Sequence, residues 1–205
     1  METKVISIFH PDVIKISLEI LQSGGLIAFP TDTVYGVAAM VQNGEAVQKI
    51  YQAKERGDNK AIPILIGDQA DLNLIASSVP ENAAKLAAAY WPGALTLVIP
   101  KSPSLPEAVS AYPTVGVRMP DYEFALKLLK VSGPLAVTSA NISGQENPLN
   151  AENVMVQLGG RIELILDGGP TPGLVPSTVV DCSTDQPIVL RSGAISEDLI
   201  RQALL

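Results

Sequence analysis

The chain has 205 residues, of which 47% are hydrophobic, and its formal net charge at pH 7 is -7. This length and apolar content suffice for one large hydrophobic core, so we expect a single domain over residues 1–205. An acidic chain is repelled on average by nucleic acid, which argues against a broad phosphate-tracking surface. The few arginines therefore become the main anion-binding candidates; they are Arg56, Arg118, Arg161, Arg191 and Arg201.

Cysteine and histidine each occur once, as Cys182 and His10. A lone cysteine excludes an intramolecular disulfide and a multi-cysteine metal site, and a lone histidine excludes a histidine metal cluster and disfavours a Ser-His triad. The longest apolar runs are far shorter than the roughly 20 residues of a membrane span, and the N-terminus lacks a secretion signal. We therefore expect a cytoplasmic protein whose chemistry rests on Lys, Arg, Asp, Glu, hydroxyls, backbone amides or a bound metal ion.

Apolar runs and turn residues predict strands along the whole chain, at 4–9, 26–29, 38–41, 61–66, 94–99, 114–119, 135–138, 162–166, 179–181 and 187–191. Helical spacing predicts helices at 11–22, 45–53, 68–76, 81–90, 121–131 and 151–158, with a last helix capped by Ser196. The first helix should place Val13, Ile16 and Ile20 on one face. The last should bury Leu199, Ile200, Ala203 and Leu204. Because strands and helices interleave irregularly, the pattern favours the α/β class with a mixed sheet.

An apolar strand, 26–29, runs directly into a hydroxyl-rich turn. Pro30 ends the strand because it has no N–H to donate, and Thr31, Asp32, Thr33 and Tyr35 follow. In open α/β sheets, ligands bind at such strand ends. A polar turn that merely caps a core strand fits this stretch as well, so the choice stays open here.

Similar polar clusters end or interrupt other apolar segments, at 54–56, 114–118, 138–141, 176–178 and 187–191. Arginine offers a planar fork of donors suited to phosphate or carboxylate, so together the clusters suggest an anionic small molecule in a concave site. Each cluster also has a structural alternative. Arg118 could pair with a carboxylate, Lys54 and Arg56 could end a helix, and Ser139, Asn141 and Ser177 could shape turns.

No P-loop or GxGxxG motif is present, but eight segments in fixed order resemble the threonylcarbamoyl-AMP synthase family, the YrdC-like domain. They are PTDTVYG at 30–36, KER at 54–56, NKAIPILI at 59–66, WPGALTLV at 91–98, TVGVRMP at 114–120, TSANISG at 138–144, PSTVVD at 176–181 and LRSGAI at 190–195. The resemblance implies a twisted mixed sheet flanked by helices with a large concave cleft. The length implies the short form of the family, without the C-terminal domain of longer members.

The resemblance also implies an activity: condensation of L-threonine, bicarbonate and ATP to threonylcarbamoyl-AMP, with release of pyrophosphate. This is the first step of N6-threonylcarbamoyladenosine formation in tRNA, and a separate transferase completes it. ATP is a substrate, and Mg²⁺ is expected to arrive with the nucleotide, since no motif names protein ligands for a metal. The expected contact with tRNA is weak or indirect, and no contact with a membrane is expected.

The family motifs assign roles to ten residues of this chain. Lys54 and Arg56 would face the ATP phosphates and carry the catalytic charge. The threonine site would comprise Thr33, Arg118, Ser139 and Ser177, with Arg118 on the carboxylate. The remaining ATP contacts would come from Lys60, Thr114, Asn141 and Arg191. Because no general base stands out, we expect catalysis mainly by positioning and by cationic stabilisation of the leaving pyrophosphate.

Three positions depart from the family pattern: Gly57 replaces a usual proline, Leu65 a threonine-contacting histidine of some members, and Leu149 a threonine near ATP. Gly57 predicts a more mobile loop, and the other two contacts are not transferred. The alternative function is an RNA-binding or ribosome-associated module of the same fold, which the charge of -7 disfavours. A relative with a changed substrate is disfavoured by the intact KER, SAN and PSTVVD segments.

Overall fold

The computed structural model describes residues 2–57, 60–172 and 175–205. Its strands are β1 Lys4–Ser7, β2 Ile27–Phe29, β3 Gly36–Met40, β4 Ile64–Leu65, β5 Leu95–Pro100, β6 Thr114–Arg118, β7 Leu135–Ser139, β8 Leu164–Asp167, β9 Thr178–Asp181 and β10 Ile188–Arg191. All belong to one sheet with the order β1-β8-β2-β3-β7-β4-β6-β5-β9-β10. Four pairs are parallel (β1–β8, β2–β8, β4–β6 and β5–β9), and the other pairs are antiparallel. The predicted α/β class with a mixed sheet is confirmed.

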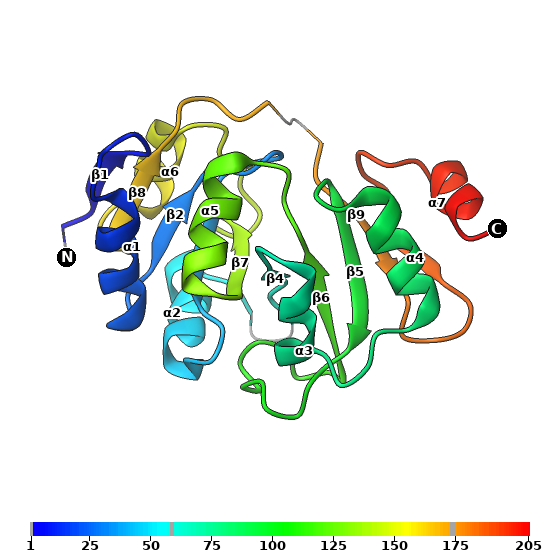
Figure 1. The fold of residues 1–205 in the computed structure, drawn as a ribbon. Helices are drawn as coiled ribbons and strands as arrows, with labels where there is room; N and C mark the ends of the chain where they lie inside the picture. The colour runs from blue at the N-terminus through cyan, green and yellow to red at the C-terminus, as the bar shows by residue number, and fades with distance from the viewer. Residues whose placement is uncertain (1, 58–59, 173–174) are drawn as a thin grey trace.

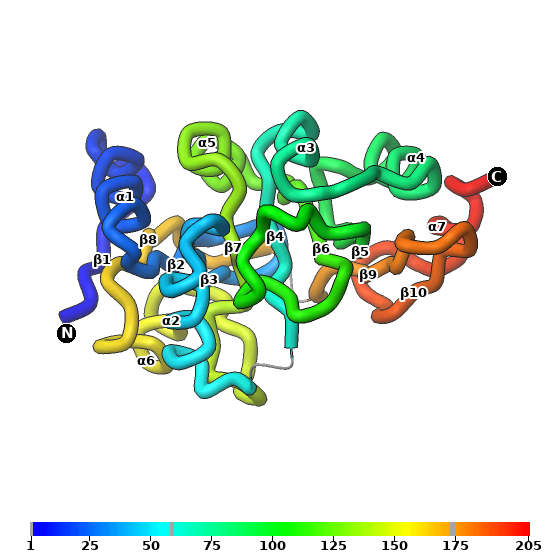
Figure 2. Tube along the Cα trace, turned by 90° about the horizontal axis from the view of Figure 1, so that it is seen from below, coloured from blue at the N-terminus to red at the C-terminus, as the bar shows by residue number. Residues whose placement is uncertain are grey.

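The helices are α1 Val13–Gln22, α2 Gly44–Lys54, α3 Leu72–Ile75, α4 Glu81–Tyr90, α5 Glu123–Ser132, α6 Ala151–Leu158 and α7 Glu197–Ala203, with a 3₁₀ turn η1 at Gln69–Asp71. Figure 1 shows the two termini at opposite ends of the sheet. In Figure 2, α1, α3, α4 and α5 lie on one side of the sheet and α2 and α6 on the other. Helix α7 packs against α4, where Tyr90 donates a hydrogen bond to the Leu199 carbonyl at 2.8 Å.

The centre of the sheet is buried on both faces, as the two-residue period of a strand requires. On β3, Val37 and Ala39 belong to one hydrophobic cluster, whereas Ala38 between them belongs to a second cluster on the opposite face. Polar side chains cap several helices at the predicted starts: Asn43 accepts from Ala46 N at 3.0 Å, and Ser196 accepts from Leu199 N at 3.4 Å. These local signals explain why most element boundaries follow from the sequence.

Three local predictions were wrong. The helix expected at 68–76 is the turn η1 followed by the single-turn α3, and the strand expected at 61–66 shrinks to β4. In the last helix Leu199 is 46% exposed while Ile200 is 2% exposed, because adjacent helical residues point about 100° apart. In α1, by contrast, Val13 is buried and Ile16 and Ile20 are partly buried against the same hydrophobic cluster, so the three share one face as predicted. Residues 58–59, of which Asn59 begins the NKAIPILI segment, and residues 173–174 lie outside the described residues.

Candidate active site

A cavity of about 450 Å³ opens on the sheet and is lined by residues of β3, β4, β5, β6, β7, β9 and β10 together with the turn after β2. Strand alternation selects which side chains reach it: Thr96 and Val98 of β5, and Gly116 and Arg118 of β6, are two residues apart and share a face. This cavity corresponds to the predicted concave cleft, and several of the predicted polar clusters contribute residues to its lining.

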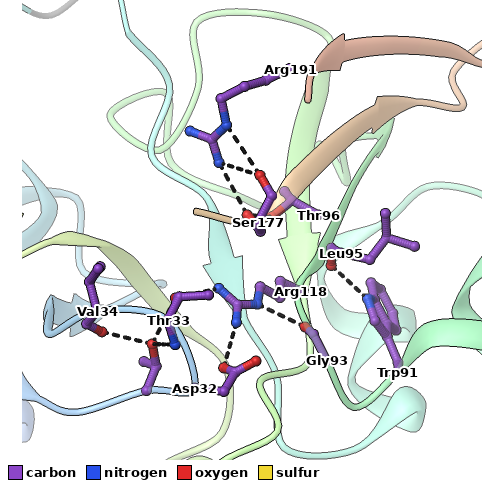
Figure 3. A network of polar contacts seen from close by, with 11 residues as sticks. Asp32, Thr33, Val34, Trp91, Gly93, Leu95, Thr96, Arg118, Ser177 and Arg191 are labelled. Atoms are coloured by element: carbon purple, nitrogen blue, oxygen red, sulfur yellow. Dashed lines mark hydrogen bonds and ion pairs between the residues drawn. The ribbon is translucent and has the colours of Figure 1, made fainter. Parts of the chain in front are cut away.

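Arg118 is held at the wall of this cavity by three partners. Its Nε donates to the Gly93 carbonyl at 2.9 Å, its Nη1 donates to Thr33 Oγ1 at 3.0 Å, and its Nη2 contacts Asp32 Oδ1 (Figure 3). Burial lowers the pKa of the Arg118 guanidinium, and the Asp32 charge opposes that shift. Within the described residues, these contacts use three of the five N–H groups of the guanidinium.

The turn after β2 is shaped by its own hydroxyls. Thr31 Oγ1 donates to the Val34 carbonyl at 2.7 Å and accepts from Thr33 N at 3.2 Å. The fully buried Tyr35 hydroxyl donates to Gly169 O at 2.7 Å and accepts from Gly168 N at 3.1 Å; burial raises the pKa of Tyr35 to about 12. Tyr35 therefore shapes the turn, while Thr33 lines the cavity.

Arg191 and Ser177 form a second polar group on the cavity wall. Arg191 Nη2 donates to Ser177 O at 2.8 Å and to Ser177 Oγ at 3.1 Å, and Thr96 Oγ1 lies 2.8 Å from the same Ser177 oxygen (Figure 3). Burial, followed by repulsion from Arg118, lowers the pKa of Arg191. The two guanidinium groups thus act within one another's electric field.

Arg56 supplies the third cation of the cavity. It follows the C-cap of α2, Glu55, whose φ of 52° turns the chain out of the helix. Its Nη2 donates to Lys60 O at 3.2 Å and Ala61 O at 3.0 Å, and burial lowers its pKa. Lys60 contributes its carbonyl to this contact, while its side chain is exposed and does not line the cavity.

Lys54, by contrast, points into the protein. The residue is 1% exposed, and its Nζ donates to Asn141 O at 2.6 Å, to Asn141 Oδ1 at 3.2 Å and to Ser139 O. The Asn141 side chain also accepts from Ser139 Oγ at 2.6 Å and donates to Gln145 O at 2.8 Å. Burial, with repulsion from Arg56, lowers the pKa of Lys54 to about 7. Lys54 and Asn141 therefore stabilise the 139–145 loop through these hydrogen bonds and do not line the cavity.

Six of the ten predicted site residues line the cavity: Thr33, Arg56, Arg118, Ser139, Ser177 and Arg191. Lys54, Lys60, Thr114 and Asn141 do not. Thr114 lies on β6 two residues before Gly116, so it extends the same face beyond the cavity lining. Thr96 was missed, although its two-residue spacing from Val98 in the strand was visible. Asp32 had been noticed but left without a role.

Within residues 2–57, 60–172 and 175–205, no three His, Cys, Asp or Glu side chains gather in a way that could hold a metal ion. The described side chains therefore do not fit a protein-held metal site. In the same part of the chain, no helix is both long and apolar enough to cross a membrane.

The protein is of the α/β class, with a mixed sheet whose cavity is lined by arginine and hydroxyl side chains. The sequence matches the profile of the Sua5, YciO and YrdC family, described as "Telomere recombination", over residues 19–193. This match covers well over half of the chain. The protein belongs to that family.

Several curated relatives are similar to this chain. It is 43% identical over 188 residues to the threonylcarbamoyl-AMP synthase of Bacillus subtilis, covering 90% of this chain and 54% of the relative. The Pyrococcus abyssi threonylcarbamoyl-AMP synthase is 42% identical over 193 residues, covering 93% and 57%. A putative threonylcarbamoyl-AMP synthase of Mycobacterium tuberculosis is 40% identical, covering 90% and 85%. The chain thus spans little more than half the length of the first two.

Solved structures agree with the fold. Pyrococcus abyssi Sua5 in complex with L-threonine has a TM-score of 0.94 at 40% identity, covering 98% of this chain and 61% of that protein. Escherichia coli YciO has a TM-score of 0.87 at 25% identity, covering 97% and 99%. The sheet and its flanking helices are therefore those of the family.

Proposed function

We propose that this protein condenses L-threonine, bicarbonate and ATP to threonylcarbamoyl-AMP and releases pyrophosphate. The observation that carries the proposal is the convergence of Arg56, Arg118 and Arg191 with Thr33, Ser139 and Ser177 in one cavity. Such a cavity suits a polyanion beside an amino acid. The names of the curated relatives and the threonine complex of the Pyrococcus abyssi protein support the same assignment.

The contacts suggest a division of the cavity between the two ligands. The other N–H groups of Arg118 face the threonine carboxylate, and the hydroxyls of Thr33 and Ser177 complete that end. Arg56 and Arg191, which donate only to neutral oxygens among the described residues, take the phosphates. Lys54 and Asn141 act through the loop that they hold, which carries Ser139.

The reaction then proceeds by positioning. Bicarbonate takes up a proton and loses water to give carbon dioxide. The uncharged threonine nitrogen attacks the carbon of this carbon dioxide and releases a proton to solvent, and a carbamate forms. A carbamate oxygen attacks the α-phosphorus of ATP; the new P–O bond forms as the bond to the β-phosphate oxygen breaks, and pyrophosphate leaves with that electron pair. Holding the reactants in line can contribute roughly 7–11 kcal/mol. Arg56 and Arg191 stabilise the charge on pyrophosphate.

The product is an activated acyl donor, so we propose that a separate transferase moves the threonylcarbamoyl group to tRNA. Magnesium would enter bound to ATP. Because the chain is acidic, the tRNA itself would be contacted weakly or only through that transferase.

The decisive assay is pyrophosphate release with each substrate omitted in turn. We expect release only when threonine, bicarbonate and ATP are all present; release without threonine, or no release, would contradict the proposal. Arg56→Ala should raise the KM for ATP. A filter-binding assay with RNA at physiological salt should show no tight complex, and a tight one would favour the RNA-binding alternative.

A further inference from the structure

The three arginines of the cavity differ in how their charges are compensated. Arg118 has a carboxylate partner, Asp32, whereas in the described parts of the chain Arg56 and Arg191 donate to carbonyl and hydroxyl oxygens only. All three guanidinium groups serve a single cavity, and Arg191 is close enough to Arg118 for their repulsion to be felt. One end of the cavity is therefore neutralised by the protein and the other is not.

The Arg118–Asp32 pair is shielded from water. Its side chains are 8% and 14% exposed, while the arginine–glutamate pair on α7 is 72% and 52% exposed. Charges that are withdrawn from water act on one another and on a ligand with little screening. A negative charge at Asp32 therefore has a strong effect on which anion can approach Arg118.

We infer that Asp32 is a specificity-determining residue that reserves the Arg118 end for a zwitterionic amino acid and keeps phosphate groups out of it. Asp32 does not itself line the cavity, but its carboxylate contacts Nη2 of Arg118. A multiply charged phosphate bound to Arg118 would therefore lie close to this carboxylate, and like charges at close range repel. An amino acid carries one carboxylate for the remaining N–H groups of Arg118 and an ammonium group that favours a nearby carboxylate. Phosphates are left to the uncompensated Arg56 and Arg191.

This inference rests on the proposed function, because it concerns how one cavity sorts two kinds of substrate. Without such a device, the phosphates of ATP or released pyrophosphate could occupy all three arginines and block threonine. Asp32 also orients Arg118 together with Thr33 and Gly93. The effect of the Asp32 charge can be separated from its effect on the orientation of Arg118. An asparagine at position 32 keeps the shape of the side chain and removes only its charge.

The test measures threonine binding by calorimetry, in the presence and absence of inorganic phosphate, with the full chain. For the wild type we expect phosphate to weaken ATP binding and to leave the Kd for threonine unchanged within twofold. In Asp32→Asn the Kd for threonine should rise at least tenfold, and phosphate should now compete with threonine. Asp32→Glu, which keeps the charge, should still exclude phosphate.

Glu197→Gln is a matched control, because it removes the carboxylate partner of Arg201 in an exposed pair on α7. It should leave threonine binding and its insensitivity to phosphate unchanged. Competition between phosphate and threonine in the wild type would overturn the inference, and this measurement does not depend on whether Asp32→Asn folds. A raised Kd in Asp32→Asn without phosphate competition would also overturn it, since a merely structural role predicts that result. If the wild type binds no threonine, the proposed function fails and the role of Asp32 fails with it.

Discussion

Tyr35→Phe should destabilise the protein by removing one oxygen atom. In the wild type the fully buried hydroxyl of Tyr35 donates to Gly169 O at 2.7 Å and accepts from Gly168 N at 3.1 Å. The substitution leaves one acceptor and one donor without this partner. An unsatisfied buried polar group costs about 1–3 kcal/mol. Because Gly168 and Gly169 are only partly buried, water can reach them, and we expect a total loss of about 2 kcal/mol.

The assay is urea unfolding followed by circular dichroism, with Tyr90→Phe as the matched control. Tyr90 donates a single hydrogen bond to Leu199 O at 2.8 Å in an exposed setting, so its loss should cost about 0.5 kcal/mol. Tyr35→Phe should also raise the KM for threonine several-fold, because the hydroxyl joins the turn that carries Thr33 to the 168–169 loop. A free energy of unfolding equal to that of the control would refute the reasoning.

Three further predictions concern the same site. Arg118→Ala should raise the threonine requirement and, by leaving Asp32 without its partner, lower the free energy of unfolding by about 3 kcal/mol in urea titrations. In Gly193→Ala the new Cβ would lie 2.4 Å from backbone atoms of the 176–178 segment, so this segment would have to shift. Kinetics should then show a weaker contribution of Ser177 to threonine binding, and calorimetry should show a lower Tm. Because burial lowers the pKa of Lys54 from 10.5 to about 7, the unfolded chain binds more protons between these values. Stability measured against Lys54→Met should therefore rise with pH in this window, by up to about 1.4 kcal/mol per pH unit, and a flat difference would show that its three acceptors keep the ammonium charged.

The sequence allowed a prediction of which segments meet, because polar clusters at the ends of apolar strands converge on one side of a sheet. Arg118, Ser139 and Ser177 follow this logic, and each lines the cavity. Helix caps and apolar runs likewise predicted most elements within a few residues. Such local signals are encoded by neighbouring residues and can be identified without tertiary contacts.

The direction of individual side chains could not be predicted in the same way. Lys54 ends a helix, and whether its amine faces a ligand or a loop depends on the position of 139–141, more than 80 residues away. Asp32 remained ambiguous because its partner, Arg118, is 86 positions away in the chain. Leu199 was wrongly predicted to be buried, because residue spacing defines the inward face of a one- or two-turn helix poorly.

The side chains that line the cavity differ in how deeply they are buried. Thr33, Ser177 and Arg118 are each at most 6% exposed and are bonded to one another or to neighbouring strands. Arg56 and Arg191 lie nearer the solvent and donate to oxygens of adjacent segments, bonds that a phosphate could replace with stronger, charge-assisted ones. In the division of the cavity proposed above, the amino-acid end is therefore the more buried one and the phosphate end the more exposed one. This difference is consistent with a site that selects one small substrate strictly and binds a flexible triphosphate beside it.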